Sequence, residues 1–141
     1  MKEFEEITGD VLHAAISLHR DLGPGLLESV YETVLGAMLA RNGYFVEHQK
    51  SIDIRYDGLY FARAFRIDLL IDSRLVVEIK SVERPNAAHR KQLLTYLRVC
   101  DLSVGMLINF GGATLIEGVS RVVNKYTPSA SPRLRVNQKQ E

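Results

Sequence analysis

The sequence predicts one α/β domain in which a central mixed β-sheet is flanked by helices. Two stretches of helical periodicity come first, a meander of short apolar runs follows, and a third helical stretch precedes a last strand of buried type. The regular alternation of strand and helix that marks a doubly wound nucleotide-binding fold is missing. The 141 residues suffice for one domain that buries a core without disulfides or structural metals.

Two helices are expected in the N-terminal third. The first is predicted over residues 8–22, where apolar residues recur on one helical stripe and Thr8 is a candidate N-cap. Gly23 ends it, since glycine suits a helix C-cap and the proline that follows cannot continue a helix. The second helix is predicted over residues 27–41.

The middle of the chain is predicted to form a strand meander. The expected strands cover residues 45–49, 52–56, 59–65 and 75–79, and the third of them can run on into residues 67–71. Asp57-Gly58 is a strong signal for a tight hairpin turn after the second of them. A helix over residues 87–99 with Asn86 as its cap follows, and then a buried strand over 104–109 and an edge strand over 115–122.

Composition excludes several classes of protein. No apolar run approaches the ~18 residues that a membrane helix needs, and the acidic N-terminal segment does not resemble a secretory signal. The single cysteine, Cys100, excludes an intrachain disulfide and a cysteine-based zinc site, and we expect it to be a small buried side chain. These observations predict a cytoplasmic protein that does not associate with membranes.

Charge is distributed unevenly, although the formal net charge is only +1. Residues 125–141 hold four basic residues and one acidic residue, so the rest of the chain has a net charge of −2. We expect residues 1–124 to form one domain and residues 125–141 to be a basic, polar, mobile tail with too little apolar surface to offset its ordering entropy. The near-neutral total removes gross positive charge as an argument for nucleic-acid binding.

The candidate chemistry is concentrated in Asp68, Glu78 and Lys80. Glu78 and Lys80 alternate with apolar residues on one strand, so they project from the same face. A hairpin partner would bring Asp68 beside them, and carboxylate oxygens together with substrate phosphate suit Mg²⁺. The competing interpretation is a solvated strand face with ordinary cross-strand pairs. The apolar density of this strand indicates burial, which would make an unpaired glutamate and lysine costly and favours a functional role.

Two further motifs flank this segment. Gln92 and Tyr96 lie four residues apart on the third predicted helix and therefore share a face, with His89 on the same side. A surface glutamine beside a tyrosine at the edge of the core would also explain the pair. Glu28 stands near the start of the second helix, where it either points toward packed surface, with Tyr31 and Leu35 on the same face, or makes a dipole or capping interaction.

Together these residues resemble a known family. The spacing of Gly25, Glu28 and Tyr31 matches the motif that names the GxxExxY proteins, and residues 105–111 are similar to the same family. A second set of residues resembles the core motifs of the PD-(D/E)xK nuclease superfamily, in its RecB-type and lambda-exonuclease-type branch: Asp68, Glu78, Lys80, Gln92 and Tyr96. The resemblance covers residues 7–123. Ile67 departs from it, since the superfamily motif has proline there.

The resemblance implies a restriction-endonuclease-like fold and Mg²⁺-dependent hydrolysis of phosphodiester bonds, with Mn²⁺ as an alternative metal. By position it assigns the metal to Asp68, Glu78 and the main-chain carbonyl of Ile79, with Glu28 as a further ligand or water contact. The expected substrate is DNA in preference to RNA, and a homo-oligomer is expected because so small a domain would need a second copy to grip duplex DNA.

The same resemblance implies roles for the remaining motif residues. Lys80 would orient or activate the attacking water. Gln92 would steady the lysine or the substrate, and Tyr96 would support the helix face or touch the nucleic-acid backbone.

Two other interpretations remain open at the level of sequence. The chain could be a catalytically inactive module with a nuclease fold that binds nucleic acid or a protein partner, which the small size, the slightly acidic domain and the basic tail would suit. It would then bind DNA in a salt-sensitive way without turnover. The third interpretation is a structural interaction protein in which Asp68 and Glu78 form ordinary ion pairs.

Overall fold

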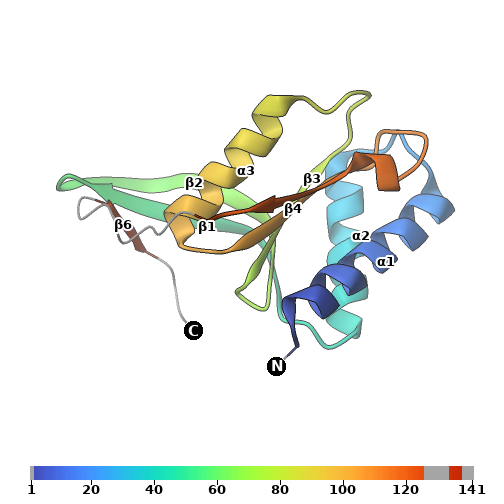
Figure 1. Ribbon diagram of the computed structural model, residues 1–141, viewed down its shortest axis with the longest axis horizontal. Helices are drawn as coiled ribbons and strands as arrows, with labels where there is room; N and C mark the ends of the chain where they lie inside the picture. Colours follow the sequence, from blue (N-terminus) through green and yellow to red (C-terminus); the bar gives the residue numbers. More distant parts are fainter. Residues whose placement is uncertain (1, 126–133, 138–141) are drawn as a thin grey trace.

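The protein is a three-layer α/β sandwich in a computed structural model that describes residues 2–125 and 134–137, with side chains described for 2–125 (Figure 1). The elements follow in this order: α1 (Phe4–Leu22), α2 (Glu28–Arg41), β1 (Val46–Tyr56), β2 (Leu59–Ile71), β3 (Leu75–Lys80), α3 (Ala87–Cys100), β4 (Val104–Asn109), the 3₁₀ turn η1 (Ile116–Gly118), β5 (Val119–Val123) and β6 (Leu134–Asn137). The predicted α/β class, a mixed sheet flanked by helices, is confirmed.

The sheet has six strands in the order β5-β4-β3-β2-β1-β6. β3 and β4 run parallel, while all other neighbours are antiparallel. The parallel pair requires a crossover, and α3 supplies it, because a parallel connection cannot be closed by a tight turn. β3 therefore lies inside the sheet, which explains why five of its six residues are buried.

Two apolar clusters hold the layers together, one on each face of the sheet (Figure 1). On one face α1 and α2 pack on alternate residues of β3 that include Val77 and Ile79. On the other face α3 packs through Leu93 and Leu97 on a cluster that includes Val76. Since side chains alternate along a strand, Glu78 and Lys80 lie on the α3 side with Val76.

The β1–β2 pair contains a register shift that divides it into two halves. Next to the turn, Tyr56 pairs with Leu59 and Ile54 with Phe61, but Ile52 pairs with Phe65. Three residues of β2, 62–64, thus lie opposite the single residue Asp53. We call the part of the pair from the turn to this bulge the hairpin tip, and the part beyond it the inner half.

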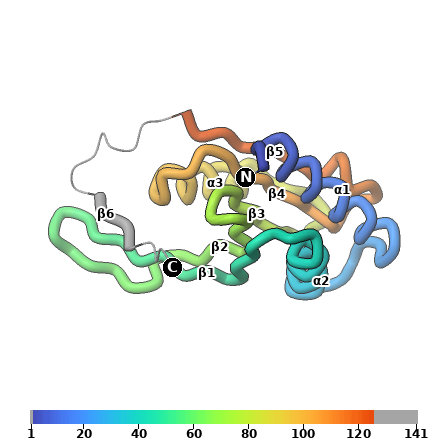
Figure 2. The backbone as a smooth tube through the Cα atoms, turned by 90° about the horizontal axis from the view of Figure 1, so that it is seen from below, coloured from blue at the N-terminus to red at the C-terminus, as the bar shows by residue number. Residues whose placement is uncertain are grey.

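Asp53 organises the bulge. Its carboxylate accepts a hydrogen bond from Arg63 N at 2.8 Å and another from Tyr60 Oη at 2.8 Å. Arg63 has a φ of 50°, in the left-handed region that only a bulge or turn demands of such a residue. The hairpin tip extends beyond the end of α3, away from α1 and α2 (Figure 2).

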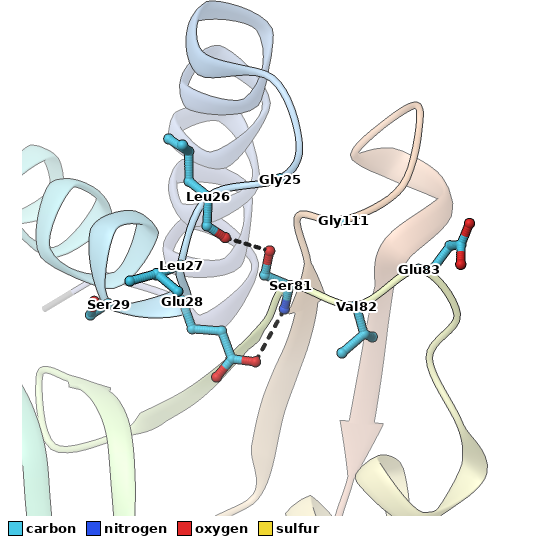
Figure 3. A pocket seen from close by; sticks show the side chains of 9 residues that line it. All are labelled: Gly25, Leu26, Leu27, Glu28, Ser29, Ser81, Val82, Glu83 and Gly111. Atoms are coloured by element: carbon cyan, nitrogen blue, oxygen red, sulfur yellow. Dashed lines mark hydrogen bonds between the residues drawn. The ribbon is translucent and has the colours of Figure 1, made fainter.

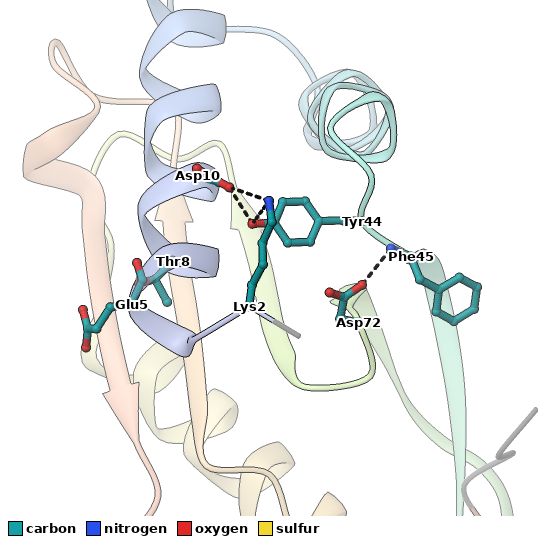
Figure 4. Close-up of polar contacts among 7 residues, drawn as sticks. All are labelled: Lys2, Glu5, Thr8, Asp10, Tyr44, Phe45 and Asp72. Atoms are coloured by element: carbon teal, nitrogen blue, oxygen red, sulfur yellow. Dashed lines mark hydrogen bonds and ion pairs between the residues drawn. The ribbon is translucent and has the colours of Figure 1, made fainter.

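A second polar network ties the start of the chain to the sheet (Figure 4). Tyr44 donates from its hydroxyl to Asp10 of α1, and Lys2 contacts both of them. At the entry to β1, Phe45 N donates to the Asp72 carboxylate at 2.8 Å, while Asp72 N donates back to Phe45 O at 2.7 Å. These bonds anchor α1 and the β2–β3 turn to the first residues of β1.

Several details differ from the sequence prediction. Thr8 is not the N-cap of α1: the helix begins at Phe4, and Thr8 Oγ1 donates to Glu5 O inside it. The helix extends further because Phe4 packs under the Arg74 guanidinium and Ile7 is fully buried in the core. The two predicted strands before the turn are one strand, whereas the strand after the turn does run on to residue 71, as the sequence allowed.

Other predictions are confirmed. Asn86 caps α3 by accepting from Ala88 N, and Asp57 and Gly58 both have positive φ, as a tight hairpin turn requires. Cys100 is buried. The segment expected as an edge strand over 115–122 instead starts with η1 and continues as β5.

Within the tail that was expected to be mobile, residues 134–137 form β6, which pairs antiparallel with β1. The remaining tail residues, 126–133 and 138–141, lie outside the described part of the chain, so their expected mobility stays a prediction. Within the residues that are described, no helix is long and apolar enough to span a bilayer.

Candidate active site

The sheet opens at its centre, and two carboxylates occupy the opening. Backbone pairing between β2 and β3 ends at Leu69 and Val77. One residue further, Asp68 Oδ2 accepts from Ile79 N at 2.8 Å, and Glu78 Oε2 accepts from Asp68 N at 2.9 Å. Each strand thus holds the carboxylate of the other through a main-chain N–H. The sequence prediction that a hairpin partner brings Asp68 beside Glu78 agrees with this geometry.

The environment of Glu78 disfavours its ionised form. Its residue is only 5% exposed, and burial together with the neighbouring Asp68 charge raises the pKa of Glu78 to about 8. The hydrogen bond from Asp68 N and the Lys80 ammonium act in the opposite direction, and the Glu32 carboxylate adds a small further increase. Without a cation the pair therefore does not hold two full negative charges near neutral pH.

Lys80 ends β3 on the same face as Glu78. Its backbone remains paired with β4, because Phe110 N donates to Lys80 O at 2.8 Å, and its side chain is half-buried. The hydrogen bond therefore holds the backbone at the end of β3, from which the Lys80 side chain extends. The Lys80 ammonium is close enough to lower the pKa of Glu78, against the larger effect of burial.

Of the two α3 residues predicted to serve the site, Tyr96 is electrostatically coupled to it. Burial, followed by the charges of Glu78 and Asp68, raises the pKa of the Tyr96 hydroxyl. The Tyr96 ring stacks on Phe65 of β2, with centroids 4.1 Å apart. Gln92 lies one turn earlier on α3 and is exposed, so its side chain is accessible from solvent.

Glu28 contacts the chain just beyond Lys80. It is the first residue of α2, and its Oε2 accepts from Ser81 N at 3.2 Å (Figure 3). Ser81 Oγ in turn donates to Leu26 O at 2.7 Å. These contacts fasten the loop before α2 to the end of β3, along an open pocket of about 600 Å³. Its lining comes from two loops and one glycine: Gly25, Leu26, Leu27, Glu28, Ser29, Ser81, Val82, Glu83 and Gly111.

The glycine and tyrosine of the Gly25–Glu28–Tyr31 motif serve the same loop. Gly25 has a φ of 104°, a conformation that other residues rarely adopt. Tyr31 is fully buried, stacks on Phe110 with centroids 4.3 Å apart, and donates from its hydroxyl to Gly23 O. Tyr31 Oη also accepts from Leu26 N. The motif thus shapes the turn that presents Glu28 to Ser81.

A buried asparagine holds the loop after β3 from the other side. Asn109 is 2% exposed; its Oδ1 accepts from Val82 N and Gly111 N, and its Nδ2 donates to Val82 O. A Cβ on Gly111 would lie 2.2 Å from Val82 O, so only glycine fits there. Asn109 and Gly111 thus fix the loop after β3 beside the pocket.

Sequence reasoning missed two residues near the carboxylate pair, Glu32 and Gln49. Glu32 of α2 is 9% exposed and accepts from Gln49 Nε2 at 2.7 Å, and the same Nε2 donates to Asp68 Oδ1 at 3.1 Å. A buried glutamate four residues after Glu28, on the same helix face, was the available signal for Glu32. Nothing in the sequence pointed to Gln49.

The donor set fits a hard divalent cation. Glu78 supplies buried and Asp68 half-buried carboxylate oxygens, and a cation would offset both the burial and the Asp68 charge that raise the pKa of Glu78. Within the described residues there is no group of three or more acidic, histidine or cysteine side chains that could hold a metal. Two carboxylates with open positions suit Mg²⁺, which keeps several waters and binds substrate phosphate.

A comparison with protein-family models identifies the superfamily of the chain. The model of the PD-(D/E)XK nuclease superfamily matches residues 5–122, which is most of the chain. The chain belongs to this superfamily. Neither the comparison with curated proteins nor that with solved structures gave a match. Membership agrees with the restriction-endonuclease-like arrangement of the sheet and indicates a nuclease that acts on nucleic acid.

Proposed function

We propose that the protein is a divalent-metal-dependent nuclease that hydrolyses phosphodiester bonds in DNA. The observation that carries the proposal is the Asp68–Glu78 pair, held by reciprocal main-chain hydrogen bonds where β2 and β3 separate, in a chain of the PD-(D/E)XK superfamily. The finer resemblance to the GxxExxY proteins and to the RecB-type branch is part of this proposal.

In the proposed mechanism Asp68, Glu78 and the Ile79 carbonyl would hold Mg²⁺ or Mn²⁺, with Glu28 as a further ligand or water contact. What the metal supplies when bound is Lewis-acid polarisation of the scissile phosphate and neutralisation of its charge. Asp68 and Glu78 are held in place in advance, because each accepts a hydrogen bond from the opposite strand. Such preorganisation lowers the cost of aligning charges during the reaction.

Lys80 would donate hydrogen bonds from Nζ to the attacking water and to a phosphate oxygen that gains charge in the transition state. Gln92 would steady the lysine or the substrate from the exposed side of α3. Tyr96, whose ring is held against Phe65, would support that helix face or touch the nucleic-acid backbone.

The decisive experiment is a cleavage assay on single-stranded DNA, duplex DNA and RNA with Mg²⁺, Mn²⁺ or EDTA. We expect cleavage of DNA that EDTA abolishes, and loss of this activity in Glu78→Ala and Lys80→Ala. Lys125→Ala is the matched control, since it removes one exposed positive charge after β5 and should cleave like the wild type.

Two outcomes would reject the proposal. Cleavage that survives both Glu78→Ala and Lys80→Ala would come from a contaminant. Salt-sensitive DNA binding with no cleavage under any metal would identify an inactive module of the nuclease fold.

A further inference from the structure

A carboxylate outside the proposed catalytic set is buried next to it. Glu32 lies on α2, 9% exposed, and β1 holds both of its oxygens. His48 Nδ1 lies 3.2 Å from Oε2, and Gln49 Nε2 donates to Oε1 at 2.7 Å. Burial of a charged group is costly unless it is paired in this way, so the contacts explain why Glu32 is tolerated but not why it is there.

Gln49 connects Glu32 to the proposed active site. Its amide nitrogen carries two hydrogens, and the distances to Glu32 Oε1 and Asp68 Oδ1 are 2.7 and 3.1 Å. His48 pairs with Leu69 and Lys50 with Ile67, so Gln49 falls opposite Asp68 in the register of the two strands. A neutral amide thereby links two carboxylates without adding charge.

The backbone of Gln49 adopts an unusual conformation at this link. Its φ is 49°, in the left-handed region that non-glycine residues outside turns seldom adopt. Such a conformation is unfavourable and is typically retained at functional sites. The side chain is otherwise exposed, so packing does not explain the strain.

We propose that Gln49, held by Glu32, is a positioning residue that sets the orientation of the Asp68 carboxylate. Asp68 Oδ2 is held by Ile79 N, and Oδ1 is held by Gln49, so rotation of the carboxylate is blocked on both sides. Each oxygen keeps a free lone pair, because a carboxylate oxygen accepts about two hydrogen bonds. The inference rests on the proposed function only where it names the metal that Asp68 would bind.

Glu32 acts through Gln49 in this arrangement and not on the metal. His48 fixes the second oxygen of Glu32, and the His48 ring lies so close to Gly36 that a Cβ there would be 2.3 Å from Cε1. Glu32 is therefore held between α2 and β1 and presents a fixed acceptor to Gln49.

The test is Mn²⁺ binding to the full-length protein, measured by calorimetry without DNA. We expect Gln49→Ala and Glu32→Ala each to weaken Mn²⁺ binding by about 10-fold or more, the usual effect of removing a residue that orients a metal ligand. The double variant should bind no more weakly than Gln49→Ala. Lys50→Ala, which alters the next residue of β1, is the matched control and should bind like the wild type.

Glu32→Gln separates positioning from direct ligation. Its amide oxygen still accepts from Gln49, so we expect Mn²⁺ binding close to that of the wild type. Binding as weak as in Glu32→Ala, or additive effects in the double variant, would overturn the inference and make Glu32 a metal ligand. Unchanged Mn²⁺ binding in Gln49→Ala would overturn it as well.

A metal-free measurement covers the case of a wild type that does not bind Mn²⁺. Hydrogen exchange at Ile79 N–H reports its bond to Asp68 Oδ2, and it should be faster in Gln49→Ala and near the wild-type rate in Glu32→Gln. Unchanged exchange in Gln49→Ala would reject the positioning role. A wild type that binds Mn²⁺ but does not cleave DNA would reject only the proposed nuclease.

Discussion

Different factors set the strand register in the two halves of the β1–β2 pair. The hairpin tip follows from local sequence: Asp57-Gly58 makes the turn and the strands pair directly away from it. Its aromatic residues are about half exposed, with Tyr60 and Phe61 both at 49%. The inner half is displaced by the bulge at Asp53 and packs between the helices. Asp68 of the candidate site lies in the inner half, so the β1 residue that faces it depends on a shift that the turn does not specify.

The bulge changes which β1 residue lies opposite Asp68. Continued without a bulge, the tip register would place Glu47 opposite Asp68, because Tyr56 pairs with Leu59. The bulge instead brings Gln49 to that position. A third carboxylate beside Asp68 and Glu78 would repel both, whereas an amide donates to Asp68.

The largest expected effect compares the candidate site with the hairpin tip. Lys80→Ala should lower the rate of metal-dependent DNA cleavage by roughly 10²–10³-fold, the usual cost of removing one donor that stabilises charge in the transition state. Tyr60→Phe at the hairpin tip removes only a hydroxyl bonded to Asp53 and should leave the rate within a few-fold. Steady-state cleavage rates of the two variants check the contrast, and a similar loss in both would contradict it.

The buried carboxyl group of Glu78, beside the inner half, predicts how stability depends on pH. The folded pKa of Glu78 is raised to about 8 from its ordinary value of 4.5, so the folded state binds its proton more tightly than the unfolded state. This contribution is fully present below pH 4.5 and is lost as pH rises through 8. Metal-free protein should therefore lose several kcal/mol of stability from this group over that range.

Denaturant unfolding at a series of pH values measures this effect. Glu78→Gln should flatten the profile, and adding Mg²⁺ should weaken it, because a bound cation favours the ionised carboxylate. A wild-type profile that matches that of Glu78→Gln would contradict the burial of the charge.

A smaller effect is expected at the junction of the two halves. Asp53→Ala removes the acceptor of Arg63 N and Tyr60 Oη, which should cost about 1–2 kcal/mol of stability. Because these bonds hold the bulge, amide chemical shifts should change in the inner half as well as at the tip. Changes confined to the tip would mean that packing alone maintains the register of the inner half.

The smallest effects come from two helical glycines. Gly9→Ala meets nothing within 4 Å and should stabilise the protein by about 0.4–1 kcal/mol. In Gly36→Ala the new Cβ would displace the His48 ring from Glu32, which should cancel that gain and lower Mn²⁺ affinity. Thermal unfolding of both variants tests the comparison, and equal stabilisation would show that His48 moves without cost.

Much of the fold could be predicted because its signals are local. The Asp57-Gly58 turn and the Asn86 cap depend on residues within a few positions, and strand alternation placed Glu78 and Lys80 on one face. The start of α1 was wrong, since Phe4 and Ile7 become helical through contacts with Arg74 and the core that lie far away in sequence.

Three features could be predicted from the sequence. They are the order of the elements, the proximity of Asp68 and Glu78, and the motifs of the superfamily that the family comparison supports. Two further contacts depend on the three-dimensional structure: Gln49 faces Asp68, and Glu32 is buried against His48 and Gln49 of β1. The physical reason is that a strand register changes every partner along the strand at once. In this chain that register is set by a bulge and by helix packing, neither of which is encoded next to the residues it aligns.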